Sequence, residues 1–138
     1  VPMIGSWTLS MANFVDNAGK NGEGTRMPQT FIQEATTPKR KAFIDAYVKA
    51  YNPPGGRMPS AVSAAQGYDS IYLLAAAMKQ ANSTEGPKIV AALENLNTKV
   101  EGVVTTYDKP YTKTDHEAIN FNNTVFGEVR GGRVVHAK

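Results

Sequence analysis

The sequence predicts an α/β fold, with helices in the middle of the chain and strands at both ends. Three observations carry this prediction. Apolar residues recur at helical spacing between residues 38 and 96, β-branched residues gather at 100–107 and 119–129, and the Gly-Gly pair at 131–132 is typical of a hairpin turn. The chain has 138 residues, of which 41% are hydrophobic and 20% charged. That composition is typical of one folded domain with a modest core.

The N-terminal segment predicts short elements joined by loops. Val1–Ile4 is apolar and precedes Gly5, which indicates a short buried strand, and we expect residues upstream of it. Ser10–Ala18 spaces its apolar residues like one or two helical turns. Lys20–Gly24 is polar and glycine-rich and predicts a loop. Thr25–Ile32 alternates weakly and contains a proline, which favours an extended connector or an edge strand.

A helix is predicted to begin at Thr37-Pro38. The threonine can cap free N–H groups, and proline at the first helical position has no N–H to leave unpaired. The helix is expected to end before Asn52, where two prolines and two glycines follow. The residues at helical spacing are Ala42, Phe43, Ala46, Tyr47, Ala50 and Tyr51.

Two more helices are predicted before the C-terminal strands. Ser60 or Ser63 caps the first, and Asn82 ends it. Its apolar stripe consists of Ala64, Tyr68, Ile71, Tyr72, Ala75 and Met78. Gly86-Pro87 begins the second helix, whose inward residues are Ile89, Val90, Leu93 and Leu96.

The longer helix contains an aromatic-acidic pair, Tyr68-Asp69, near its start. The alanines that follow let another element approach closely. We interpret the pair as structural, with the Asp69 carboxylate near a helix N-terminus, where negative charge is favoured.

The C-terminal part of the chain predicts strands and one loop. Val100–Tyr107 is rich in β-branched residues and predicts a strand, whereas Asp108–Glu117 is polar and predicts a loop. Ile119–Val129 predicts a second strand. The Gly-Gly turn then returns the chain as Val134–His136.

Charge and composition exclude several classes of protein. The net charge is +3, and the basic residues are scattered. A nucleic-acid-binding protein would need them on one face, and we predict no nucleic-acid partner. The residues concerned are Lys39, Arg40, Lys41, Arg130 and Arg133. The chain has no cysteine and no apolar run near the ~20 residues that span a bilayer, and we expect no signal peptide within it.

The sequence predicts no enzyme, no catalytic residue, no metal site and no cofactor. His116 and His136 belong to no cluster with metal-ligand spacing. Asp115-His116-Glu117 is the triplet that a small hydrolase or lyase could use, and this class is kept as an alternative. It would require a nucleophile or a metal within reach of His116.

Trp7 is the strongest candidate for a binding residue. It is the only tryptophan, and it follows the end of a predicted strand, where α/β proteins gather their ligands. Ser6 and Thr8 place a hydroxyl on each side of it, so the segment offers an aromatic face between two polar groups. The alternative is an indole that only closes the core. Phe31 and Gln29 are further candidates of the same kind.

Several short stretches, each weak alone, together carry a resemblance to a known family. They are Val1–Gly5, Ala18-Gly19, Glu23-Gly24, Ala42-Phe43 with Tyr47 and Tyr51, Gly67–Asp69, Leu73–Ala77, Ile89–Leu93, Gly102 and Asp115-His116. Their order and spacing resemble the C-terminal part of type I periplasmic solute-binding proteins of branched-chain-amino-acid-type ABC importers.

The resemblance implies a two-lobed fold with a solute held in the cleft between the lobes. Residues 1–29 would belong to the C-terminal lobe, residues 30–118 to the N-terminal lobe, and residues 119–138 to the C-terminal lobe again. The implied function is the extracytoplasmic, periplasmic solute-binding component of an ABC importer. Its partners would be a small-molecule solute and the membrane subunits of the transporter. The ligand-binding sensor domain of a receptor is the alternative that the same fold allows.

One departure from the family bears on the ligand. In amino-acid-binding members the position of Trp7 is typically acidic and pairs with the solute's ammonium group, a charge that is costly to leave bare in a dry cleft. An indole cannot neutralise that charge. We therefore predict a small aromatic or apolar carboxylate, stacked on Trp7, rather than a standard α-amino acid. A chain that holds only this part of the fold would leave apolar faces uncovered, so we expect it either to self-associate or to be the stable remnant of a longer protein.

Overall fold

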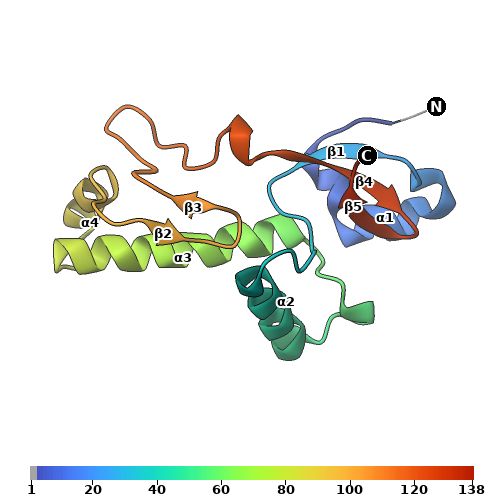
Figure 1. Cartoon of the computed structure of the whole chain (residues 1–138), viewed down its shortest axis with the longest axis horizontal. Helices are drawn as coiled ribbons and strands as arrows, with labels where there is room; N and C mark the ends of the chain where they lie inside the picture. The colour runs from blue at the N-terminus through green and yellow to red at the C-terminus, as the bar shows by residue number, and fades with distance from the viewer. Residues whose placement is uncertain (1–2) are drawn as a thin grey trace. The chain divides into compact units, whose positions relative to one another are not determined.

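The computed structural model describes residues 3–138 and confirms a mixed fold of helices and strands (Figure 1). The chain divides into two compact units. The first unit is the described part of Val1–Ala64 together with Thr124–Lys138, and the second unit is Ala65–Asn123. The lobe boundaries implied by the resemblance stay a prediction. No helix among the described residues is both long enough and apolar enough to cross a membrane.

The first unit is built on a three-stranded antiparallel sheet. β1 (Arg26–Gln29), β4 (Val125–Arg130) and β5 (Arg133–His136) pair in the order β1-β4-β5. β1 confirms the extended segment predicted there. The hairpin turn between β4 and β5 is also confirmed, since Gly131 and Gly132 have φ values of 56° and 72°. Glycine adopts this left-handed conformation without the steric cost that a side chain would add.

The predicted strand Ile119–Val129 is wrong in its first half. Phe121–Asn123 forms the 3-10 turn η4 instead. There the Asn120 side chain accepts a hydrogen bond from the Asn122 N–H at 3.0 Å, and the Asn123 side chain accepts one from the Asn120 N–H at 3.1 Å. Asparagine side chains that bond nearby backbone groups in this way compete with strand pairing.

The buried strand predicted at the start of the chain is also wrong where it can be compared. Val1 and Pro2 lie outside the described residues. Ile4 is exposed, and it forms only an isolated parallel bridge with Arg26.

Three short helices connect this segment to β1. They are η1 (Trp7–Ser10), α1 (Ala12–Ala18) and η2 (Gly19–Gly22). α1 confirms the predicted helical turns, whereas η2 occupies part of the predicted loop Lys20–Gly24. α1 lies against the sheet, and the centre of this core is formed by Val15, Met27 and Val129.

α2 (Pro38–Tyr51) confirms both predicted ends of its helix. The Thr37 hydroxyl accepts a hydrogen bond from the Arg40 N–H at 3.2 Å, which is the expected cap. Asn52 ends the helix in the left-handed conformation. The helix is joined to the rest of the first unit by the edge-to-face contact of Phe43 with Phe31, whose ring centroids are 5.7 Å apart.

The second unit packs two helices against a small hairpin. α3 (Ala61–Ala81), of which the residues from Ala65 onward belong to this unit, is followed by α4 (Gly86–Leu93). β2 (Val100–Glu101) and β3 (Thr106–Tyr107) pair antiparallel. Small residues bring the helices close, and the buried cluster is Leu73, Ala77, Ala92, Leu96, Val100 and Tyr107.

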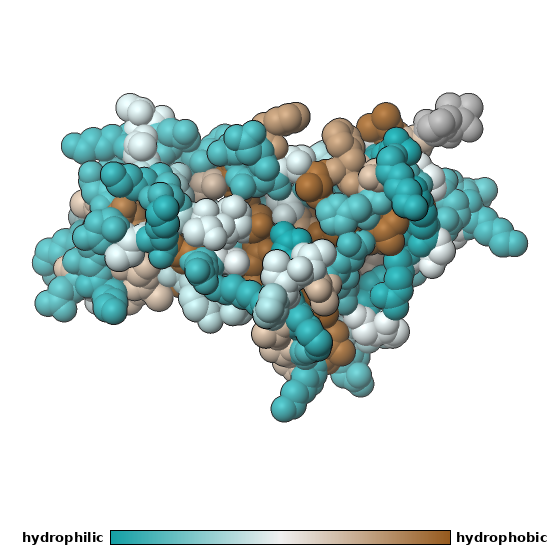
Figure 2. All heavy atoms as spheres, viewed as in Figure 1, coloured by the Kyte–Doolittle hydropathy of each residue, from teal (hydrophilic) through white to brown (hydrophobic). Residues whose placement is uncertain are grey.

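The apolar stripe predicted for α3 does not mark its buried face. Ile71 is 64% exposed and Tyr72 is also exposed, whereas the buried positions are Val62, Ala65, Asp69, Leu73 and Ala77. These residues also follow helical spacing, so the helix was predicted correctly and its orientation was not. On α4, Val90 is exposed rather than inward. Figure 2 shows hydrophobic residues in patches among hydrophilic ones on the surface.

The strand predicted at Val100–Tyr107 is wrong because Asp69 reverses the chain in its middle. The Asp69 side chain is 1% exposed. It accepts hydrogen bonds from the backbone N–H groups of Val103 (2.6 Å) and Val104 (2.9 Å) and from the Tyr107 hydroxyl (3.0 Å). A buried carboxylate requires such partners. Through these three hydrogen bonds Asp69 fixes the β2–β3 hairpin on α3.

Candidate functional site

Trp7 lies at the start of η1, directly after the short N-terminal segment. Its side chain is 42% exposed, so the indole is neither sealed in the core nor fully in solvent. The backbone before it is fixed to β1, because the Gly5 N–H donates to the Arg26 carbonyl at 3.1 Å. A side chain at Gly5 would collide with Leu9, since an added Cβ would lie 2.3 Å from its Cδ1. A larger residue at position 5 would therefore require the Leu9 side chain to move.

The hydroxyl groups on either side of Trp7 are hydrogen-bonded to each other. Ser6 Oγ and Thr8 Oγ1 are 2.5 Å apart, and both residues are exposed. The triplet therefore presents one half-exposed aromatic ring and a joined pair of hydroxyls. Together they form a surface that could take a ring by stacking and a polar group by hydrogen bonding.

Gln29 is hydrogen-bonded to the main chain of Trp7. Its side chain is 2% exposed, and Nε2 donates to the Trp7 carbonyl at 3.2 Å and to the Pro28 carbonyl at 2.7 Å. The same Trp7 carbonyl accepts a second hydrogen bond from Ser10 Oγ at 2.7 Å. Gln29 thus supports the triplet through a hydrogen bond to the Trp7 backbone.

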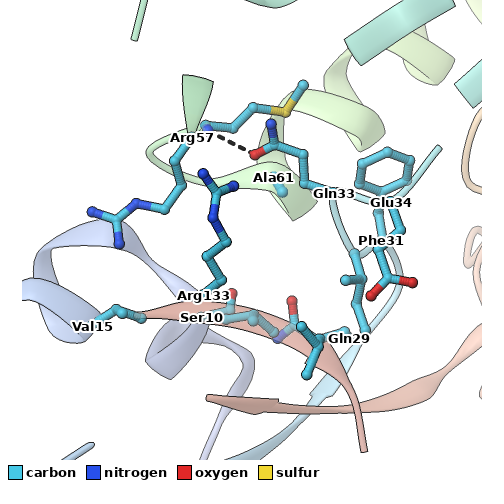
Figure 3. A pocket seen from close by; sticks show the side chains of 13 residues that line it. Ser10, Val15, Gln29, Phe31, Gln33, Glu34, Arg57, Ala61 and Arg133 are labelled. Carbon is cyan, nitrogen blue, oxygen red and sulfur yellow. Dashed lines mark hydrogen bonds between the residues drawn. The ribbon is translucent and has the colours of Figure 1, made fainter. Parts of the chain in front are cut away.

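Gln29 and Phe31 both line a cavity of about 150 Å³ within the first unit (Figure 3). Ser6, Trp7 and Thr8 do not line it. The five candidate residues predicted from the sequence therefore divide into two groups, an exposed triplet and a buried pair. Gln29 connects the two groups, because it hydrogen-bonds the Trp7 carbonyl and lines the cavity, and Ser10 does the same.

Apart from Gln29, the charged and amide groups of the cavity wall come from residues that the sequence analysis did not predict as binding residues. Gln33, Glu34, Arg57 and Arg133 all line it. Figure 3 shows the side chains of Arg57 and Arg133 on one side, and Gln29 and Glu34 on the other. These residues come from three separate segments of the sequence and carry no motif. The one available signal was that Arg133 directly follows the predicted hairpin turn, whose strands must return to the core.

Gln33 and Arg57 form hydrogen bonds that fix the loop around Gly56, next to the cavity. Gln33 Nε2 donates to the Gly56 carbonyl at 2.7 Å, and its Oε1 accepts the Met58 N–H at 2.8 Å. The Arg57 guanidinium pairs with the Asp16 carboxylate at 2.5 and 2.6 Å and donates to the Gly132 carbonyl at 2.8 Å. These bonds tie the η3 loop (Pro54–Gly56 and the residues after it) to α1 and to the hairpin turn.

Tyr68-Asp69 is structural, as expected, but for a different reason. Asp69 lies well inside α3 and acts through the hairpin rather than through a helix N-terminus. Burial raises the pKa of the Tyr107 hydroxyl above its usual range, and the adjacent Asp69 carboxylate adds to the effect. The Tyr68 hydroxyl donates to that of Tyr72 at 3.1 Å, and this hydrogen bond, with burial, raises the pKa of Tyr68 to about 12.

The Asp115-His116-Glu117 triplet is not assembled as a catalytic group. His116 Nε2 lies 3.2 Å from Glu94 Oε1, and the His116 ring is mostly exposed. Asp115 accepts the Glu117 N–H through Oδ1 at 2.9 Å, which is a local turn contact. Within residues 3–138, no group of three His, Cys, Asp or Glu side chains is arranged to hold a metal ion.

Several of the basic residues considered for nucleic-acid binding are engaged elsewhere. Lys41 pairs with Asp45 along α2. Arg130 Nε donates to Glu128 at 2.7 Å, and Arg26 Nε donates to the same carboxylate at 2.9 Å. The Arg130 guanidinium, followed by Arg26, holds the pKa of Glu128 below its usual range.

A family model described as "periplasmic binding protein" matches residues 2–133 of the chain. A search of curated proteins found no match to the chain. Among solved structures, the chain is similar to a solute-binding protein from R. palustris in complex with benzoate, with 18% identity and a TM-score of 0.70. It is also similar to a leucine-binding protein from Thermotoga maritima, with 20% identity and a TM-score of 0.74. A third similar structure is a putative branched-chain amino acid ABC transporter protein from Rhodospirillum rubrum, with 27% identity and a TM-score of 0.66.

Each of these similarities covers 99% of this chain. The chain spans only part of the length of the structures it matches. It covers 35% of the benzoate complex, 36% of the leucine-binding protein and 37% of the third structure.

Proposed function

We propose that this chain, which belongs to the type I periplasmic binding protein family, is part of the solute-binding component of an ABC importer. In this role the protein acts outside the cytoplasm and captures a small molecule between two lobes. It then presents the closed, loaded form to the membrane subunits of the transporter. Binding drives closure only if the solute makes better contacts in the closed state than in the open one.

The observation that carries the proposal is the exposure of Trp7 at the end of the N-terminal segment. The indole is 42% exposed and is accompanied by the Ser6 and Thr8 hydroxyls. Its backbone is held by the buried Gln29. A large aromatic face that is fixed in place and partly open to solvent is what a binding wall requires.

We further propose that the solute is a small aromatic or apolar carboxylate. Trp7 has no negative charge to offer an ammonium group, and a bare ammonium in a dry cleft is costly. The triplet can instead stack on a ring and donate from a hydroxyl. The similar R. palustris protein was crystallised with benzoate, which is a solute of this class, whereas the similar T. maritima protein is named for leucine.

Thermal shift with benzoate and with leucine tests this proposal, because a ligand that binds the folded state raises its melting temperature. We expect benzoate to raise the melting temperature and to change the fluorescence of Trp7, the only tryptophan in the chain. Trp7→Ala should abolish both the benzoate shift and its concentration dependence. A shift with leucine and none with benzoate would overturn the proposed solute class.

Self-association of this chain stays a proposal of its own. It rests on the exposed apolar side chains of α3, including Ile71 and Tyr72. Light scattering tests it, and a single monomeric species at high concentration would contradict it.

A further inference from the structure

The cavity in the first unit has the size of a site for a small ligand. Its volume of about 150 Å³ is below the ~300–1,000 Å³ of pockets that take drug-sized molecules. Every residue that lines it belongs to the first unit. The indole, which carries the proposed function, takes no part in it.

One side of the cavity carries a positive charge that is not neutralised by a neighbour. Arg133 lines the cavity, and its Nη2 donates to the Gly55 carbonyl at 3.0 Å. Within the described chain Arg133 forms no ion pair, whereas the nearby Arg57 is paired with Asp16. A guanidinium has five N–H donors in a planar fork. Arg133 therefore keeps both its charge and most of its donors for an incoming carboxylate.

The other side of the cavity carries a negative charge that is only weakly compensated. The Glu34 carboxylate has one ion-pair contact, with His136 Nε2 at 3.6 Å, and that ring is charged only if it is protonated. Figure 3 shows Glu34 and Arg133 on opposite sides of the cavity. A simple anion would be attracted by Arg133 and repelled by Glu34, so the pair of charges favours a ligand that carries both signs.

Part of the cavity lining is apolar. Ala61, Val134 and Val135 line the cavity and are partly exposed. A short hydrocarbon chain could therefore lie against them while each end of the ligand meets its counter-ion.

From this arrangement we propose that the cavity is a second binding site, distinct from the Trp7 triplet, for a small zwitterion whose charges are separated by a short apolar chain. The ligand carboxylate is bound by Arg133. The ligand ammonium is bound by Glu34, and the methylene groups between the two charges pack on Ala61 and Val134.

Calorimetric titration of the 138-residue chain with three matched compounds tests the proposal. The compounds are 5-aminopentanoate, pentanoate and pentylamine, which share one hydrocarbon chain and differ in their charged ends. We expect 5-aminopentanoate to bind at least about tenfold more tightly than either of the others, which is the effect of one charge-assisted hydrogen bond. Equal affinity for pentanoate and 5-aminopentanoate, or no binding of any compound, would overturn the proposal.

Two variants assign the two ends. Glu34→Gln should weaken 5-aminopentanoate about tenfold and make its affinity equal to that of pentanoate. Arg133→Gln should weaken it by a similar factor and make its affinity equal to that of pentylamine. Lys20→Gln removes an exposed charge of the same unit and should change nothing. An unchanged affinity in either cavity variant would contradict the assignment.

Folding and independence from the Trp7 site are controlled separately. Arg133→Lys keeps the positive charge, so it should retain measurable binding even if Arg133→Gln lowers the melting temperature. Trp7→Phe should leave the titration with 5-aminopentanoate unchanged. A loss of binding in Trp7→Phe would show that the two sites are one and would overturn the inference. Failure of benzoate to bind, by contrast, concerns only the proposed function.

Discussion

The buried amide of Gln29 donates a hydrogen bond to the main-chain carbonyl of Trp7 at 3.2 Å. The two residues are 22 positions apart, and one is buried while the other is half exposed. The orientation of the indole depends on a side chain that no ligand at the Trp7 triplet would need to touch.

Gln29→Met tests this dependence. Methionine has a similar size but no donor, so the Trp7 carbonyl keeps only its bond from Ser10. We expect the free energy of unfolding to fall by about 1–2 kcal/mol and the emission spectrum of Trp7 to shift. Urea denaturation and fluorescence measure the two effects. Lys20→Met, an exposed control, should stay within about 0.5 kcal/mol of the parent, and an unshifted spectrum in Gln29→Met would refute the link.

Asp69→Asn should destabilise the second unit more than any surface change. The carboxylate accepts three hydrogen bonds from the hairpin. In asparagine one of the two oxygens is replaced by an NH₂ group, which would face an N–H or O–H donor and leave it without an acceptor. The expected cost is about 2–3 kcal/mol in urea denaturation. Asp45→Asn, which disrupts an exposed pair on α2, serves as the control at under about 1 kcal/mol. Similar losses in both variants would argue against a special role for Asp69.

Gly102 allows the hairpin to approach Asp69, and Gly102→Ala should reveal this. An added Cβ would lie 2.2 Å from Asp69 Oδ2, so the carboxylate or the hairpin must move. We expect a loss of about 1–3 kcal/mol. In a background that already carries Asp69→Ala, the same change should cost clearly less, because the clashing group is gone. Additive losses in this double-mutant cycle would mean that the contact is not the cause.

The pair of arginines around Glu128 predicts a defined acid sensitivity. The folded pKa of Glu128 is lowered from its ordinary value of 4.5, so the folded state favours the charged form. The stability that this gives is complete above the unfolded pKa and is lost as the pH falls through the folded pKa. Glu128→Gln should therefore flatten the decline of stability below about pH 4.5. The double change Arg26→Met and Arg130→Met removes the cause and should flatten it too; a profile that stays as steep in both would exclude Glu128 as its source.

Local signals in the sequence predicted the ends of elements well. Thr37-Pro38 and Asn52 bound α2, and Gly131-Gly132 forms the turn of the C-terminal hairpin, because each acts through its own backbone conformation or cap. The family was also predictable, since the order of several weak stretches survives at low identity.

The orientation of α3 and the course of residues 100–107 were not predictable in this way. Both depend on Asp69, a charged residue that is buried because three donors from a distant segment surround it. Patterns of hydrophobicity place a carboxylate outside, and they place Ile71 and Tyr72 inside, so the wrong face of the helix was chosen. The cavity was not predicted for a related reason, because Glu34 and Arg133 are brought to one cavity only by the tertiary structure.

The sheet of the first unit joins segments that are about a hundred residues apart, as in the contact of Arg26 with Glu128. The second unit, by contrast, is one continuous stretch. During synthesis on a ribosome, Ala65–Asn123 can fold as soon as it has emerged. β1, by contrast, can pair only after β4 has been synthesised. Until then β1 has an unpaired strand edge. A chaperone would bind the nascent chain at this stage.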